Sequence, residues 1–212
     1  MKYTPVLLAL FLGGCVSTGN SLPGTLTSMF HPDQPETVAL SAPPPEVRSP
    51  VRLADMAVRS LRDDDTRRFD VSAFGNGYRV RQDNGCVWTR QRGWFSPSDS
   101  WANCGESTNW HTASAQVRQK DPLYPLRLGA EGRYERRATS HTGRSYVRET
   151  ICRVTDAEAV VRPARPDTPA WVVACNDGKR VRTTWYAPGE GPVAFTQVSA
   201  SGSLEESWIR IR

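Results

Sequence analysis

The sequence predicts a mainly β fold: an antiparallel meander that forms a sandwich or an open barrel, preceded by a short helix and a disordered linker. After about Arg67, alternating apolar and polar residues are separated by recurring Gly, Asn and Asp turns, a pattern typical of such folds. No apolar run approaches the roughly 20 residues that a membrane-spanning helix needs. We therefore divide the chain into a signal peptide (1–14), a lipidated proline-rich linker (15–50), a short helix (51–65) and a disulfide-braced β-rich domain (66–212).

The N-terminus has the features of a secretory signal peptide. Lys2 supplies a positive start, Val6–Leu12 is apolar, and Gly13-Gly14 provides small residues before Cys15. The apolar part is far too short to span a bilayer. The sequence therefore indicates export and removal of this segment.

Leu12-Gly13-Gly14-Cys15 resembles the lipobox of bacterial lipoproteins, in which the cysteine is acylated and the peptide is cut just before it. The resemblance implies that Cys15 carries palmitate-type chains and that the membrane is a partner through this anchor. In such lipoproteins an Asp after the cysteine retains the product in the inner membrane, and Val16 stands there instead. The resemblance thus implies an outer-membrane protein whose domain lies in the periplasm or at the cell surface.

Residues 15–50 have the composition of a tether. They are rich in Pro, Ser and Thr and show little periodic hydrophobicity, so they cannot bury enough apolar surface to offset their ordering entropy. Pro43-Pro44-Pro45 favours extended polyproline II, which acts as a semi-rigid spacer. We expect this linker to hold the domain away from the lipid head groups.

A short helix is predicted directly after the linker. Ser49 and Pro50 suit the N-cap and the first helical position. Apolar residues then follow at helical spacing: Leu53, Met56, Ala57 and Leu61. Asp63-Asp64-Asp65 lacks the spacing of a calcium loop, so we interpret it as a solvated turn that ends the helix.

Three hairpins dominate the β-rich domain. Their turns are Asp83-Asn84-Gly85, His141-Thr142-Gly143 and Asn176–Lys179, each between alternating segments. Val193–Val198 and Ser207–Ile211 supply the closing strands. These segments predict antiparallel neighbours throughout the domain.

The cysteines indicate a disulfide framework. Of the five, Cys15 is assigned to the lipid, which leaves an even number for the oxidising periplasm: Cys86, Cys104, Cys152 and Cys175. Four cysteines permit three pairings, and we favour Cys86–Cys104 with Cys152–Cys175 because each pair closes a local loop. Each loop would contribute roughly 3 kcal/mol to stability.

Motifs for chemistry are missing from the sequence. It contains no Gly-x-Ser-x-Gly, no His-Glu-x-x-His and no phosphate-cradling glycine loop, so we expect no enzyme and no cofactor. No Cys-x-x-Cys exists and no histidine stands near a cysteine at ligand spacing, so we expect no metal site. A hydrolase that uses His111 with Ser96, Ser98 or Asp99 is a distant alternative.

The basic charge does not identify a partner. The formal net charge is +5, and 24 of the 27 basic residues are arginine because Lys2, Lys120 and Lys179 are the only lysines. Without a DNA- or RNA-binding motif, we interpret this charge as solvated strand faces and expect no nucleic-acid partner.

Tryptophan is abundant, with seven residues in the chain. Trp88, Trp171 and Trp185 fall in alternating strands and are expected in the core. The other tryptophans of interest lie in a loop-rich stretch close to arginines, and together these residues form a candidate binding patch: Trp94, Trp101, Trp110, Arg90 and Arg92.

Leu123–Ile211 resembles uncharacterised exported β-rich domains of Gram-negative lipoproteins. The residues that carry the likeness are Leu123–Gly129, Tyr134, Cys152, Cys175 and Arg182–Pro188, with Gly77–Trp88 as the strand–turn–strand upstream. The resemblance implies one β unit over about Phe69–Arg212 and no catalytic residue.

These inferences lead to an expected function. We expect a non-enzymatic, outer-membrane lipoprotein whose periplasmic domain binds or scaffolds an envelope partner, either a protein or a glycan. An alternative is a carrier of lipid or acyl chains, which would need an open apolar pocket. A flat patch of aromatic rings and arginines would favour partner binding instead.

Overall fold

The fold is described by a computed structural model, which describes residues 33–105 and 109–212. The predicted signal peptide, Cys15 and the first part of the predicted linker lie outside the described residues. Within them the regular structure is entirely β, in thirteen strands. In chain order these are β1 (Thr37–Ala39), β2 (Met56–Ser60), β3 (Thr66–Phe74), β4 (Gly77–Gln82), β5 (Val87–Arg90), β6 (Ser100–Ala102), β7 (Ala113–Asp121), β8 (Glu131–Ser140), β9 (Ser145–Val160), β10 (Thr168–Asn176), β11 (Arg180–Ala187), β12 (Gly191–Ser199) and β13 (Leu204–Arg210).

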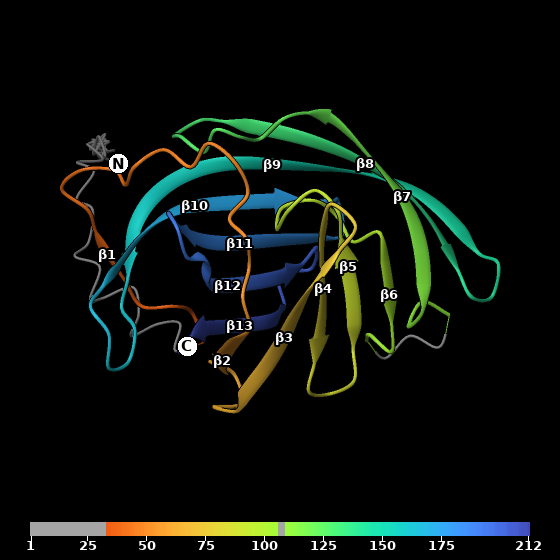
Figure 1. The fold of residues 1–212 in the computed structure, drawn as a ribbon, viewed down its shortest axis with the longest axis horizontal. Coiled ribbons are helices and arrows are strands. Elements are labelled where there is room, and N and C mark those ends of the chain that lie inside the picture. The colour runs from red at the N-terminus through yellow and green to blue at the C-terminus, as the bar shows by residue number, and fades with distance from the viewer. Residues whose placement is uncertain (1–32, 106–108) are drawn as a thin grey trace, which may run out of the picture.

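Twelve of these strands form a closed antiparallel barrel, and β1 adds to its side. Neighbours in sequence pair from β2 through to β13, and the ring closes where β13 pairs with β2. In Figure 1, β10–β13 run across the view and β3–β6 run down it, with β8 and β9 arching over both. The sequence predicted a sandwich or an open barrel, and the β13–β2 pairing corrects this to a closed one.

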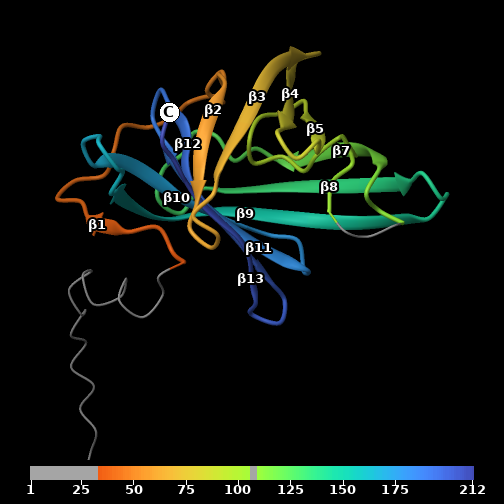
Figure 2. The same cartoon turned by 90° about the horizontal axis from the view of Figure 1, so that it is seen from below.

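The long strand β9 joins the two parts of the barrel. Ser145–Arg153 pairs with β8, whereas Ile151–Val160 pairs with β10, so one strand of 16 residues serves two neighbours. Its last residues also pair with β1. The β8–β9 hairpin therefore extends beyond the strands β10–β13 (Figure 2).

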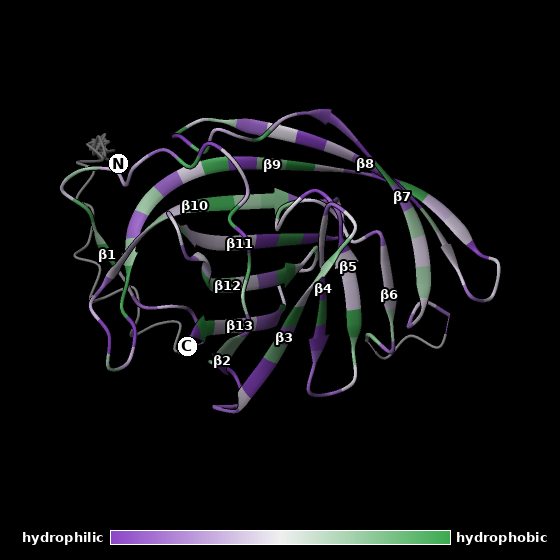
Figure 3. Ribbon diagram, in the orientation of Figure 1, coloured by the Kyte–Doolittle hydropathy of each residue, from purple (hydrophilic) through white to green (hydrophobic). Residues whose placement is uncertain are grey.

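The three predicted hairpins are confirmed as β4–β5, β8–β9 and β10–β11, and the two closing strands as β12 and β13. Apolar and polar residues alternate along strands such as β8 and β9 (Figure 3), so one face of each strand can point inward. Trp88, Trp171 and Trp185 are buried, as expected.

The predicted helix at 51–65 is wrong. Met56–Ser60 is instead the strand β2, and Met56 and Val58 point into the core with 2% and 0% exposure. The chain then turns through Leu61–Asp63, where Ser60 N donates to Asp65 O at 2.8 Å, and continues as β3. A helix could not fill the gap between β13 and β3, because each of these strands has backbone groups that require a β partner.

The described part of the predicted disordered linker, residues 33–50, is also ordered against the barrel. Thr37–Ala39 pairs with β9, and buried Val47 accepts a hydrogen bond from Leu126 N at 2.9 Å. The carbonyl of Pro45 accepts from Trp171 Nε1 at 3.1 Å. Prolines lack a donor but keep an acceptor, so a proline-rich segment can still be fixed by donors from the domain.

Loops fill the interior as well as strands. The β5–β6 loop brings Trp94 and Phe95 into the main core, and the β7–β8 connection adds Leu123 and Leu126. Gly132 makes one of these approaches possible, since a Cβ there would lie 2.6 Å from the Leu123 Cβ. The interior of the barrel is thus packed with side chains, which leaves limited free space.

Candidate functional site

Two disulfides brace the barrel with the pairing that we favoured from the sequence. Cys86–Cys104 joins the start of β5 to the segment after β6, with an S–S distance of 2.00 Å. Cys152–Cys175 links directly opposite residues of β9 and β10, with an S–S distance of 2.08 Å. Both bonds therefore hold neighbouring segments of the ring together.

The candidate patch residues do not form one surface. Trp94 is only 5% exposed, and its indole donates to Thr184 Oγ1 at 3.0 Å inside the barrel. Arg90 lies against the Trp94 ring at 5.1 Å, whereas Arg92 is exposed on the loop. Trp94 therefore cannot serve in a surface patch, because the β5–β6 loop folds inward and buries its ring against other aromatic rings.

Trp101 and Trp110 do come together, and Tyr146 joins them. The indole of Trp101, on β6, donates to the Trp110 carbonyl at 2.6 Å. The rings of Trp110 and Tyr146 have centroids 4.8 Å apart. All three residues are half-buried, so part of their surface remains available.

Two arginines lie on these rings. The Arg136 guanidinium is 5.3 Å from the Trp101 ring and 5.4 Å from the Tyr146 ring, and the Arg148 guanidinium is 4.7 Å from Tyr146. Guanidinium planes over aromatic faces interact favourably and hold both partners in place. We call Trp101, Trp110, Tyr146, Arg136 and Arg148 the aromatic–arginine patch. Sequence reasoning missed its last three members, because β8 and β9 reach Trp101 only through the tertiary fold.

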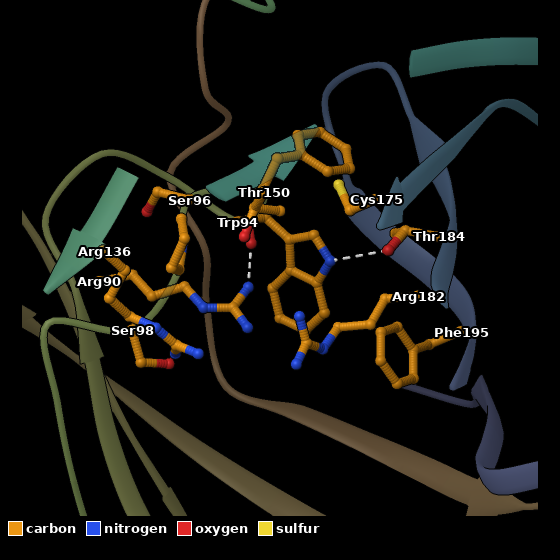
Figure 4. A pocket seen from close by; sticks show the side chains of 12 residues that line it. Arg90, Trp94, Ser96, Ser98, Arg136, Thr150, Cys175, Arg182, Thr184 and Phe195 are labelled. Carbon is orange, nitrogen blue, oxygen red and sulfur yellow. Dashed lines mark hydrogen bonds between the residues drawn. The ribbon is translucent and has the colours of Figure 1, made fainter. Parts of the chain in front are cut away.

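Next to the patch lies a partly open cavity of about 80 Å³. Figure 4 shows the side chains of Arg90, Arg136 and Arg182 around it, with the Trp94 ring between them. These arginines come from β5, β8 and β11, three strands that are distant in sequence. Because Arg136 belongs to both, the patch and the cavity are adjoining parts of one region.

The cavity arginines have few acidic partners. Arg90 Nη1 donates to the neutral carbonyl of Trp94, and the guanidinium stacks on the Trp88 ring at 4.6 Å. Burial lowers the pKa of both Arg90 and Arg136. The ordinary arginine pKa is so high that both groups remain charged. Among the described residues, Arg182 is the one of the three that forms an ion pair, with Asp177 at 3.2 Å.

Two carboxylates lie near this positive charge. Burial opposes the ionisation of Asp177, but Arg182 and the backbone N–H groups of Lys179 and Arg180 outweigh it, so its pKa is lowered. Burial raises the pKa of Glu206, which also feels Arg182 and Arg90. The negative charge of Asp177 is therefore favoured, and two arginines share it, whereas burial disfavours the negative charge of Glu206.

The two histidines of the domain lie together. The His111 and His141 rings contact each other, with centroids 4.5 Å apart, and His141 Nδ1 lies 3.1 Å from Thr112 O. Ser96 lines the cavity, where its hydroxyl donates to Gly93 O at 3.0 Å. Asp99 accepts from Gln91 N at 2.7 Å.

Within 33–105 and 109–212, no cluster of His, Cys, Asp or Glu is arranged to hold a metal ion. In that part of the chain, no helix is long and apolar enough to cross a membrane. The region of interest is therefore the aromatic–arginine patch with the cavity beside it. Comparisons with protein-family models, with curated proteins and with solved structures found no match.

Proposed function

We propose that this chain is a non-enzymatic, lipid-anchored protein of the outer membrane that binds an envelope partner, a glycan or a protein, through the aromatic–arginine patch. One observation carries the proposal: Trp101, Trp110 and Tyr146, from three separate segments, are half-buried side by side, and guanidiniums lie over the Trp101 and Tyr146 rings. Aromatic rings and arginines are the side chains that contribute most at protein interfaces. Rings also present flat faces on which sugars stack.

The rings of the patch are held in place before any partner arrives. A hydrogen bond joins Trp101 to Trp110, and Arg136 lies between the Trp101 and Tyr146 rings. Side chains that are already ordered lose little conformational entropy on binding, which favours affinity. This order supports a role in recognition.

A carrier of acyl chains is the alternative that we rank second. Such a carrier needs an apolar space large enough for a hydrocarbon chain. The cavity found here measures about 80 Å³ and has three arginines in its wall. We therefore favour binding of a partner over carriage of a lipid.

Replacing Trp110 and Tyr146 with alanine should abolish partner capture in intact cells. We expect the amount of material crosslinked to the double variant to be at least about tenfold lower than for the wild type. The reason is that two central aromatic side chains at an interface often contribute more than about 2 kcal/mol to binding. The measurement is crosslinking in cells, with protein partners identified by mass spectrometry and glycan partners by co-sedimentation with purified cell-wall material.

Phe74→Ala is the matched control for this experiment. Phe74 is also a half-buried aromatic residue, and the Arg79 guanidinium lies over it at 4.6 Å, but it sits on β3, away from the patch. The control should capture the same material as the wild type. Equal capture by all three proteins would exclude the patch as the binding site.

The proposed anchor has its own test. In protein purified from cells, we expect the first residue to be Cys15 with acyl chains attached, and Cys15→Ala should remove incorporation of labelled palmitate. Each buried CH₂ contributes about 0.8 kcal/mol, so several chains hold a protein on the membrane almost permanently. An intact mass that begins at Met1 and carries no lipid would refute the anchor.

A further inference from the structure

We propose that the cavity is a binding site for a phosphate group, either inorganic phosphate or a phosphate monoester on a larger envelope molecule. Its binding residues are Arg90, Arg136 and Arg182. This site is chemically distinct from stacking on the patch. It does not require the patch to bind anything.

The arrangement of the three guanidiniums supports the site. Arg90, Arg136 and Arg182 come from β5, β8 and β11, and all three line the same space (Figure 4). Arginine presents its N–H groups in a planar fork that matches the oxygens of phosphate. Bringing three like charges to one space has an energetic cost that a bound anion would remove.

Unused hydrogen-bond donors are the second observation. The Nε atoms of Arg90 and Arg136 are buried, and neither has a hydrogen-bond partner among the described residues. Buried donors are nearly always satisfied in folded proteins, so unsatisfied ones require an explanation such as a water or an ion. Both unsatisfied donors belong to charged side chains that line one cavity, and this combination indicates an anion.

The charge balance favours an anion. Arg148 and Arg182 both pair with Asp177, at 3.8 Å and 3.2 Å. With Arg90 and Arg136 the region holds four arginines, against three carboxyl groups that interact with them: Asp177, Glu206 and Asp99. Burial raises the pKa of Glu206 and of Asp99, which disfavours their negative charge, so the arginines are left with an excess of positive charge that suits a phosphate.

The size and the remaining wall of the cavity agree with this ligand. A buried water requires a free volume of roughly 10–15 Å³, so a cavity of about 80 Å³ can hold a few waters or one small anion. The hydroxyl-bearing residues Ser98 and Thr150 also line it, and hydroxyls can donate to phosphate oxygens. The Trp94 ring forms part of the wall, and an apolar wall strengthens charge interactions beside it.

Titration calorimetry on the purified full-length protein tests the proposal. We expect inorganic phosphate to bind, acetate to bind at least about tenfold more weakly, and Arg136→Gln to weaken phosphate binding by about 10–100-fold through loss of charge-assisted hydrogen bonds. Tighter binding of a sugar 1-phosphate than of phosphate would identify a monoester as the ligand. Equal or weaker binding of the sugar 1-phosphate would identify free phosphate.

Two further variants make the result decisive. Arg79→Gln removes an exposed arginine that stacks on Phe74 outside the cavity, and it should bind phosphate as the wild type does. Trp110→Ala should also keep phosphate binding, which separates this site from the function proposed for the patch. If Arg136→Gln does not fold, as judged by circular dichroism, Arg182→Gln takes its place. The proposal fails if phosphate does not bind the wild type, or if the folded cavity variant binds it equally well.

Discussion

Replacing Trp94 with alanine should lower the free energy of unfolding by about 3–5 kcal/mol, the largest effect that we expect from a single substitution. The Trp94 ring contacts those of Trp88, Phe195 and Trp208, with centroids 5.9, 6.3 and 6.1 Å away. Alanine would leave a cavity at the centre of this cluster, and the rigid strands around it could not collapse to fill the space. Urea unfolding followed by circular dichroism measures the change.

Two variants test whether this effect arises from packing. Trp94→Phe keeps a ring and loses the hydrogen bond to Thr184, so it should be destabilised by about 1 kcal/mol beyond the smaller loss in ring volume. Trp110→Ala removes a half-buried ring from the patch and should cost about 1 kcal/mol. Equal destabilisation by Trp94→Ala and Trp110→Ala would contradict the difference in burial between the two residues.

Removal of the disulfide between Cys152 and Cys175 should have the second largest effect, about 3 kcal/mol. The two cysteines are 23 residues apart, and a crosslink of this span limits the freedom of the unfolded chain by roughly that amount. The double variant Cys152→Ala/Cys175→Ala avoids leaving a lone reactive thiol. We expect it to fold in buffer and to unfold at lower urea concentration.

The other disulfide supplies the comparison. Cys86→Ala/Cys104→Ala opens a loop of similar span, 18 residues, and should cost nearly as much. Wild-type protein treated with a reductant should lose about the sum of the two effects, whereas a variant without either disulfide should not respond to the reductant. A reductant effect of the same size in that variant would show that the stabilisation comes from elsewhere.

The confirmed predictions share one physical property: they depend on residues that are near each other in sequence. The Asp83-Asn84-Gly85 turn between alternating segments determines the β4–β5 hairpin locally, and Gly85 adopts a φ of +84° that favours glycine. The same holds for β10–β11. The disulfide pairing was also local, since each bond closes a short loop.

The wrong predictions concern segments whose structure depends on distant partners. Met56, Ala57 and Leu61 have helical spacing, yet Met56–Ser60 becomes a strand because β13 and β3 flank it. Trp94 belongs to the candidate binding patch in the sequence analysis because it lies in a loop-rich stretch close to arginines. Its actual surroundings come from β5, β12 and β13, which no local pattern reveals.

From the order of its residues alone, this chain is defined as a β-rich protein with local hairpins, an even set of bonded cysteines, and an N-terminus with the pattern of an exported lipoprotein. Closure of the barrel, burial of Trp94 and the meeting of three arginines in one cavity were decided only by the tertiary structure. The physical reason is that turns and short loops depend on local backbone preferences. Barrel closure and cavity formation instead depend on satisfying strand edges and burying side chains between segments far apart in the chain.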